Sequence, residues 1–132
     1  MKMNTEKQFL ACAPYFVVRN LRKSLDYYCG VLGFIRPELW GEPPTFAMPH
    51  RDGMTFMLYE GDAGTTPIPN LNKGGYWDAY IWVRDLDALF DEFKAAGAAF
   101  EYETLVREEY GNKEFAVTDP DGYMIAFGQQ ID

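Results

Sequence analysis

The chain has 132 residues, 48% of them hydrophobic, which is enough for one domain with a buried core and no disulfide framework. Its 12 Lys and Arg against 20 Asp and Glu give a net charge of −8, so positive charge is not concentrated for nucleic-acid phosphates. No apolar run approaches the roughly 18 residues that a membrane span needs. We therefore expect a single domain, residues 1–132, with neither nucleic acid nor membrane as partner.

Aromatic residues make up 17% of the chain, more than a core of this size needs, so some can line a ligand cavity. Cys12 and Cys29 form neither a CxxC nor a spaced metal motif, which favours free, mostly buried thiols in a reducing compartment. The N-terminal MKMNTEKQF lacks the apolar core of a signal peptide. These features predict a cytoplasmic protein.

The first half of the chain is expected to run strand, helix, strand, strand, strand. Alternating aromatic and branched residues predict a strand over 13–18, and Asn20 can cap a helix that ends at Gly30 or Gly33. Three more strands are expected at 34–39, 45–48 and 54–59, the last after the turn-forming HRDG. The following GDAGTTPIPNLNKGG is rich in Gly and Pro and contains the expected linker, 63–73.

The second half repeats this order. A strand over 76–83 precedes Asp85, the expected cap of a helix that Gly97 ends. Strands follow at 100–104, 114–118 and 124–127, and a DPDG turn joins the last two. FVVRNLRKSLDYY (16–28) and IWVRDLDALFDEF (81–93) show the same pattern 65 residues apart, which indicates an internal duplication. The predicted fold class is α+β, with β-α-β-β-β repeats over 1–62 and 74–132 whose half-open mixed sheets enclose a cavity.

Period-two alternation assigns the two faces of the strands. One face is continuously apolar and suits packing on the helices: Phe16, Val18, Phe56, Leu58, Ile81, Val83, Ile125 and Phe127. The opposite face is aromatic, small or polar: Ala13, Tyr15, Val17, Met57, Tyr59, Asp78, Tyr80, Trp82, Met124 and Ala126. The second set suits a ligand better than a sealed core.

Three segments resemble the glyoxalase / bleomycin-resistance / extradiol-dioxygenase superfamily, also called the vicinal oxygen chelate superfamily. They are PYFVVRNLRKSLDYYCGVLGF, YIWVRDLDALFDEFKAAGAAF and KEFAVTDPDGYMIAFGQ. The resemblance covers essentially the whole chain. It implies paired β-α-β-β-β modules, usually dimeric, with a small-molecule cavity in each sheet.

Enzymes of this family bind a divalent metal through His, Gln or Glu on the inner faces of equivalent strands. The resemblance puts these positions at Ala13, Met57, Asp78 and Ala126, or at Tyr59 or Glu60 instead of Met57 if the register shifts. Alanine has no donor atom, and a divalent metal needs three or more protein ligands. The only histidine, His50, lies outside this set and is expected at a loop or strand edge. We therefore predict no metal, no cofactor and no catalytic residue.

Family members that lack the metal include the bleomycin-resistance proteins, which bind and sequester their drug without modifying it. Tyr110 and Gly111 stand before NKEF, where those binders carry a Trp-Gly or Tyr-Gly pair. Pro14 matches a proline in their first strand, from which an N-terminal arm can cross to the other subunit. The resemblance thus implies a homodimer that completes the cavity at its interface.

A groove of this kind stacks conjugated rings on aromatic faces and meets cationic groups with carboxylates. The predicted ligand-binding residues are Tyr15, Phe46, Tyr59, Asp78, Tyr80, Trp82, Tyr110 and Glu114. Each of these rings has a core position as its alternative, and Trp40 is either a groove wall or a dimer contact. Each of the two carboxylates has an ion pair with Arg19, Arg84 or Arg107 as its alternative.

The expected function is metal-free binding and sequestration of a small, cationic and aromatic molecule such as a bleomycin-type antibiotic. One alternative is a lyase or other enzyme of the superfamily that acts on a small carbonyl or thiol substrate. Another is a passive binder of a cell metabolite. Paired-carboxylate catalysis is disfavoured, because neither the spacing of the acids nor a neighbouring histidine supports proton transfer.

Overall fold

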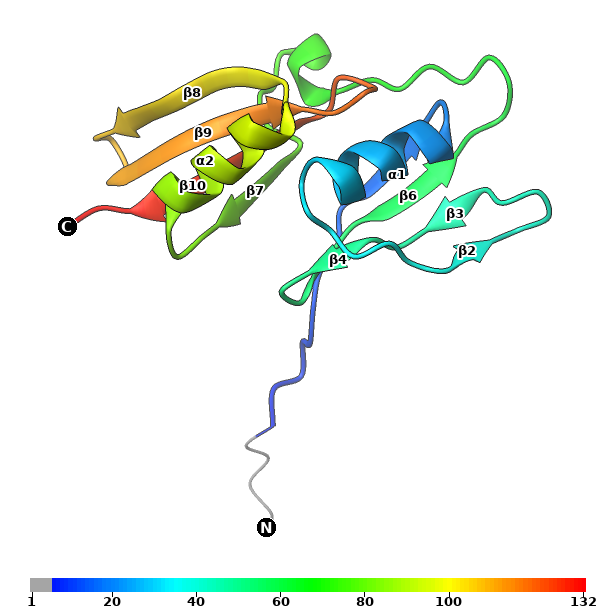
Figure 1. Cartoon of the computed structure of the whole chain (residues 1–132), viewed down its shortest axis with the longest axis horizontal. Coiled ribbons are helices and arrows are strands. Elements are labelled where there is room, and N and C mark those ends of the chain that lie inside the picture. The colour runs from blue at the N-terminus through cyan, green and yellow to red at the C-terminus, as the bar shows by residue number, and fades with distance from the viewer. Residues whose placement is uncertain (1–5) are drawn as a thin grey trace.

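Each half of the chain carries a strand, a helix and then further strands in a computed structural model that describes residues 6–132 (Figure 1). In chain order the elements are β1 (Tyr15–Val18), α1 (Leu21–Gly30), β2 (Leu39–Trp40), β3 (Phe46–Ala47), β4 (His50–Arg51), β5 (Met54–Thr55), β6 (Met57–Glu60), a 3₁₀ helix (Asn70–Lys73), β7 (Ala79–Trp82), α2 (Leu86–Ala96), β8 (Phe100–Arg107), β9 (Asn112–Thr118) and β10 (Met124–Gln130). The first sheet has the order β1-β6-β3-β2 and the second β7-β10-β9-β8, while β4 and β5 form a separate hairpin.

Both four-stranded sheets are mixed. β1 runs parallel to β6 and β7 runs parallel to β10, whereas the remaining pairs are antiparallel. The two helices lie on the same side of the two sheets (Figure 1). The predicted α+β fold with two β-α-β-β-β repeats is therefore confirmed.

The helices begin where the sequence predicts. The side chain of Asn20 accepts a hydrogen bond from the Lys23 N–H, and that of Asp85 accepts one from the Ala88 N–H. These bonds satisfy donors that the first helical turn leaves free. Gly97 ends α2 in the left-handed conformation, at φ 84°.

The last strand of each repeat also contacts the start of its own helix. Glu60 in β6 accepts from the Leu21 N–H at 2.7 Å, and Gln129 in β10 accepts from the Leu86 N–H at 2.8 Å. The two bonds span 39 and 43 residues, so the second repeat is four residues longer between its helix and this acceptor. The duplication is therefore preserved in equivalent polar contacts as well as in the apolar pattern.

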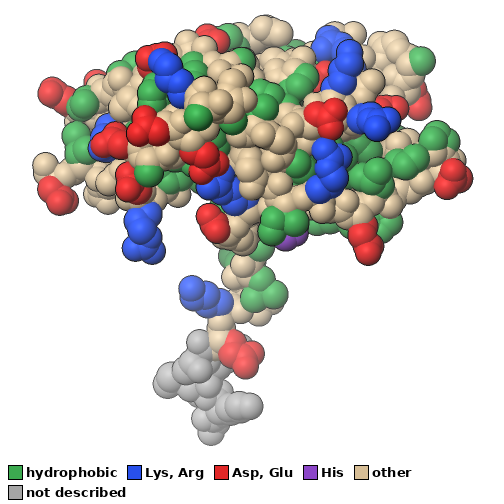
Figure 2. All heavy atoms as spheres, viewed as in Figure 1, with side chains coloured by type: hydrophobic (Ala, Val, Ile, Leu, Met, Phe, Trp, Pro, Cys, Tyr) green, Lys and Arg blue, Asp and Glu red, His purple; other side chains and the backbone are tan. Residues whose placement is uncertain are grey.

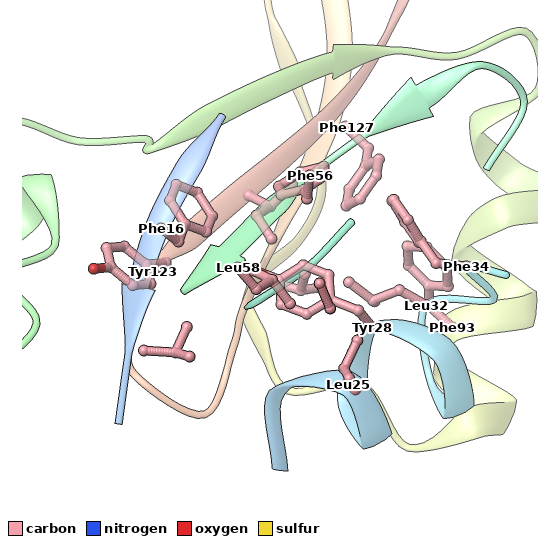
Figure 3. Close-up of a cluster of buried hydrophobic side chains, with 14 of the residues drawn as sticks. Phe16, Leu25, Tyr28, Leu32, Phe34, Phe56, Leu58, Phe93, Tyr123 and Phe127 are labelled. Carbon is pink, nitrogen blue, oxygen red and sulfur yellow. The ribbon is translucent and has the colours of Figure 1, made fainter. Parts of the chain in front are cut away.

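One buried cluster takes side chains from both repeats (Figure 3). Of the face predicted to pack on the helices, six side chains are at most 5% exposed: Phe16, Val18, Phe56, Leu58, Ile125 and Phe127. Ile81 and Val83 are half-buried against the same cluster. Burial of each large apolar side chain contributes about 1.5–3 kcal/mol, so each repeat stabilises the other.

The turn between β9 and β10 lies against the first repeat. The Tyr28 hydroxyl donates to Asp119 at 2.8 Å. The Tyr123 ring stacks on Phe16, with ring centroids 4.2 Å apart and planes 8° apart (Figure 3). Its hydroxyl donates to the Val17 carbonyl at 2.7 Å. Stacking and hydrogen bonding together close this side of the seam between the repeats.

The first sheet is smaller than the alternating pattern predicts. Strands expected over 34–39 and 45–48 are reduced to the two residues each of β2 and β3. Three prolines interrupt this stretch and a fourth follows it, and each lacks the N–H that a strand ladder needs: Pro37, Pro43, Pro44 and Pro49. In the second sheet, by contrast, three strands are longer than predicted: β8, β9 and β10 extend past 100–104, 114–118 and 124–127.

Both cysteines are free, but Cys12 is exposed and Cys29 is only half-buried, so the expectation of mostly buried thiols was wrong. Cys12 lies in the segment before β1, which projects from the body of the molecule (Figure 1). His50 is exposed at the short β4, as expected. Within residues 6–132, no helix has the length and apolar character to cross a bilayer. On the face in Figure 2, acidic and basic side chains are interspersed rather than gathered into a basic patch.

Candidate functional site

The second sheet carries a group of rings on the face opposite its helix, which we call the aromatic face: Trp77, Tyr80, Trp82, Tyr102 and Tyr110. Ring centroids of Tyr80 lie 4.9 Å from Trp77 and 4.8 Å from Trp82, and those of Trp77 and Tyr110 lie 6.4 Å apart. Trp82 is 68% exposed and Tyr110 45% exposed. Neighbouring, outward-facing rings of this kind can stack with a flat ligand.

Glu114 lies at the centre of the aromatic face, and its side chain is fully buried. Its Oε1 accepts from the Tyr80 hydroxyl at 3.0 Å and from the Tyr110 hydroxyl at 2.6 Å. Its Oε2 accepts from the Tyr102 hydroxyl and from Arg107 Nε, the latter at 3.4 Å. An unpaired buried carboxylate is costly, and these four donors offset that cost. The ion pair with Arg107 is thus present for Glu114.

The hydroxyls of Tyr80 and Tyr102 also accept a hydrogen bond from a second side chain each. Asn112 Nδ2 donates to the Tyr80 hydroxyl at 2.9 Å, and Trp77 Nε1 donates to the Tyr102 hydroxyl at 2.9 Å. Burial, together with the hydrogen bonds to Glu114, raises the pKa of Tyr80, Tyr102 and Tyr110. The phenols therefore stay protonated at neutral pH and keep donating. Their rings are oriented before any ligand arrives, which lowers the cost of ordering them on binding.

The corresponding face of the first sheet carries a smaller group of rings: Tyr15, Trp40, Phe46 and Tyr59. Tyr15 stacks on Tyr59 with centroids 6.3 Å apart, and Trp40 lies 5.7 Å from Phe46. Tyr15 is 55% exposed and Trp40 48% exposed. In the described part of the chain, no ring contact joins this group to the aromatic face of the second sheet.

Asp78 makes its hydrogen bonds to the backbone. Its Oδ1 accepts from the Asn70 N–H at 2.9 Å, and its Oδ2 accepts from the Met124 N–H at 2.8 Å. These bonds tie the 3₁₀ helix, which lies at the end of the predicted linker, to the start of β10. Both carboxylate oxygens thus have a structural role, although the sequence placed Asp78 on the same face as Tyr80 and Trp82.

The four positions that correspond to the family's metal ligands do not fit a divalent metal. Ala13 and Ala126 have no donor atom, and Met57 offers only a thioether sulfur. Both oxygens of Asp78 already accept backbone N–H groups. Across residues 6–132, no group of three or more His, Cys, Asp or Glu side chains is arranged to hold a metal ion.

The sequence did not single out Tyr102, Trp77 or Asn112. Tyr102 has the same parity in β8 as Phe100, which packs against the core, so simple alternation would turn it inward. A register shift in the β8–β9 pairing lies between these two residues and brings Tyr102 to the aromatic face. Asn112 could have been found, because it lies two residues before Glu114 on the same strand.

Comparison with known proteins agrees with this architecture. A family model described as Glyoxalase/Bleomycin resistance protein/Dioxygenase superfamily matches residues 9–127. A bleomycin resistance protein of Geobacillus stearothermophilus is 28% identical over an alignment of 132 positions that covers 92% of this chain and 98% of that one.

Two solved structures share the fold at lower identity. One is the bleomycin-binding protein from bleomycin-producing Streptomyces verticillus, complexed with copper(II)-bleomycin: TM-score 0.68, 21% identity, coverage 92% of this chain and 97% of that chain. The other is a glyoxalase-related enzyme from Clostridium phytofermentans, with TM-score 0.74, 16% identity and coverage of 96% and 100%. Since the family model matches most of its length, the chain belongs to the Glyoxalase/Bleomycin resistance protein/Dioxygenase superfamily.

Proposed function

We propose that this protein is a non-catalytic binder that sequesters a small molecule with a planar aromatic part, with bleomycin-type antibiotics as the representative class. The supporting observation is the aromatic face, whose phenols and buried carboxylate already satisfy one another. What remains available to a ligand is mainly ring surface. The likeness to proteins described as bleomycin-resistance and bleomycin-binding proteins supports this class of ligand.

Stacking is expected to contribute more to affinity than ion pairing. Trp82 and Tyr110 expose their rings, whereas the oxygens of Asp78 and Glu114 are used inside the protein. A cationic group on the ligand would therefore meet ring faces by cation–π contact rather than a free carboxylate. Affinity should therefore depend only weakly on salt.

We further propose that the protein acts without metal or cofactor, as a homodimer in the cytoplasm. The unsuitable donor set at the family's metal positions supports the first point. The two groups of exposed rings, which do not touch within one chain, support the second, because a second copy could cover both. The free thiols of Cys12 and Cys29 support a reducing compartment.

Calorimetric titration with metal-free bleomycin tests this proposal. Tyr110→Ala should weaken binding by about 1–3 kcal/mol, the value of one aromatic stacking platform. Tyr110→Phe keeps the ring and removes only the hydroxyl, so it should bind almost as the wild type does. Ile68→Ala, an exposed residue outside both ring groups, serves as the surface control.

Two outcomes would overturn the proposal. Unchanged affinity in both Tyr110→Ala and Trp82→Ala would place the binding site elsewhere. Chemical conversion of the ligand, seen by mass spectrometry after incubation, would end the sequestration hypothesis. It would favour a lyase or other superfamily enzyme acting on a carbonyl or thiol group.

A further inference from the structure

The seam between the two repeats is closed on one side and open on the other. On the closed side, Tyr123 follows the β9–β10 turn, stacks on Phe16 and is only 7% exposed. The equivalent turn of the first repeat joins β4 and β5. Gly53 and Gly122 have positive φ, 81° and 89°, at matching points of the two turns. They lie 69 residues apart, which is also the spacing of Glu60 and Gln129, the two acceptors at the helix starts. Met54 is thus the counterpart of Tyr123.

Met54 is 49% exposed and does not fill its side of the seam. A pocket of about 410 Å³ lies there, within the range of about 300–1,000 Å³ usual for small-molecule sites. Both repeats line this seam pocket: Leu32 and Phe34 from the first, and Leu89 and Phe127 from the second. Ile81, Trp82 and Val83 also line it in sequence, so the backbone of the edge strand β7 faces the pocket.

The groups that hold Tyr123 on the closed side have counterparts in the seam pocket. Ile81 corresponds to Phe16, which stacks on the Tyr123 ring, and Trp82 corresponds to Val17, whose carbonyl accepts from the Tyr123 hydroxyl. The Val83 N–H bonds to the Gly128 carbonyl of β10. Strand alternation therefore turns the Trp82 carbonyl to the free edge of β7, where it can accept a hydrogen bond.

The ion pair beside Tyr123 on the closed side has no equivalent among the described charged residues around the seam pocket. Arg19 and Asp121 pair at 3.3 Å beside Tyr123. Their counterparts, Arg84 and Asp52, both line the seam pocket, but no ion pair joins them in the described chain. Arg51, also at the rim, is neutralised by two hydrogen bonds to Glu92, at 2.7 and 2.9 Å. Charges of both signs at the rim favour a neutral ligand over an anion or a cation.

We propose that the seam pocket is a second small-molecule site, which borders the aromatic face at Trp82 and takes a neutral planar aromatic alcohol such as a phenol or naphthol. The ring packs against Ile81, as Tyr123 packs on Phe16. The hydroxyl donates to the Trp82 carbonyl, as that of Tyr123 donates to Val17. The inference is independent of the function proposed for the aromatic face.

An NMR titration of the ¹⁵N-labelled full chain with 2-naphthol tests this site. The amide of Val83, which shares a peptide group with the Trp82 carbonyl, and that of Leu89 should shift. Naphthalene, which lacks the hydroxyl, should bind about fivefold more weakly, the effect of one hydrogen bond. Shifts confined to Glu114 and Ala116 on the second sheet, or no shifts at all, would overturn the proposal.

Substitutions at position 54 give the matched comparison. Met54→Tyr should fill the seam pocket as Tyr123 fills the closed side, and so abolish the shifts at Val83. Met54→Leu adds no ring and should keep them. If Met54→Tyr fails to fold, Ala88→Phe places a ring at the same pocket from the exposed surface of α2. The proposal would be wrong if folded Met54→Tyr, or folded Ala88→Phe in its place, still bound 2-naphthol as the wild type does.

Discussion

Gly128 in β10 leaves the space that the Tyr80 ring occupies. A Cβ at position 128 would overlap the Tyr80 Oη and lie 2.7 Å from its Cζ. The ring cannot yield freely, because the hydroxyl is held between Glu114 and Asn112. We expect Gly128→Ala to lower the free energy of unfolding by about 1–3 kcal/mol, as overpacking usually does, and to disorder the aromatic face.

Urea denaturation in a double-mutant cycle checks this expectation. In a Tyr80→Ala background the ring is gone, so Gly128→Ala should cost less than about 0.5 kcal/mol. The difference between the two costs measures the clash itself. Equal costs with and without the Tyr80 ring would show that the glycine is needed for the strand backbone instead.

The sequence predicted the face of the sheet on which Glu114 lies better than it predicted the contacts of that side chain. Alternation in β9 put Glu114 opposite the apolar face, and Arg107 was among the named partners. Alternation could not predict that phenols from three different segments converge on one carboxylate. It also failed for Tyr102, because a bulge is a local change of backbone register with no side-chain pattern of its own.

At the scale of elements, the β9–β10 turn depends on Asp119. Its Oδ1 accepts from the N–H groups of Asp121 and Tyr123, each at 2.9 Å, and its Oδ2 accepts from the Tyr28 hydroxyl. Burial raises the pKa of Asp119 to about 6, although these hydrogen bonds act to lower it. The turn therefore contains a buried acid that titrates in the mildly acidic range.

This pKa predicts a pH dependence of stability. Because the folded-state pKa lies above the ordinary 3.8, the folded chain binds a proton more tightly than the unfolded chain between about pH 4 and 6. The stabilisation from this group is complete below that window and is lost as the pH rises through 6. The difference in pKa corresponds to about 3 kcal/mol.

Asp119→Asn keeps an oxygen acceptor for the turn but cannot titrate. The free energy of unfolding of the wild type relative to this variant should therefore fall by up to about 3 kcal/mol between pH 4 and 7. Urea denaturation at several pH values provides the measurement. Asp91→Asn, an exposed acid on α2, controls for the loss of a charge. A constant difference across this range would show that Asp119 keeps an ordinary pKa.

Elements were predictable where one physical signal dominates. The N-caps at Asn20 and Asp85 and the apolar faces of the strands followed from residue type and period. The short lengths of β2 and β3 were not predicted, because the hydrophobic pattern suits a strand even where prolines lack the N–H groups for pairing with a neighbouring strand.

At the scale of the whole molecule, we propose that residues 1–132 form one domain with repeats over 1–62 and 74–132 and a linker over 63–73. The shared buried cluster and the contacts of the β9–β10 turn with the first repeat support this organisation. The internal duplication could be predicted because the two helix-forming segments kept the same residue pattern. The open side of the seam could not be predicted, since it depends on Met54 in the first repeat standing where the second repeat has Tyr123.

The outward rings of both sheets predict the assembly. Tyr15, Trp40 and Trp82 are each about half exposed or more, so one chain leaves apolar ring surface uncovered. We expect sedimentation at micromolar concentration to give twice the 15.2 kDa of the single chain. Tyr15→Glu would bury an unpaired charge in that interface and should shift the equilibrium to the single chain. Ile68→Glu introduces the same charge at an exposed site outside the ring groups and should leave the dimer intact. A wild-type chain that sediments only at 15.2 kDa, or a Tyr15→Glu dimer as stable as the wild type, would mean that another surface, or no second copy, covers these rings.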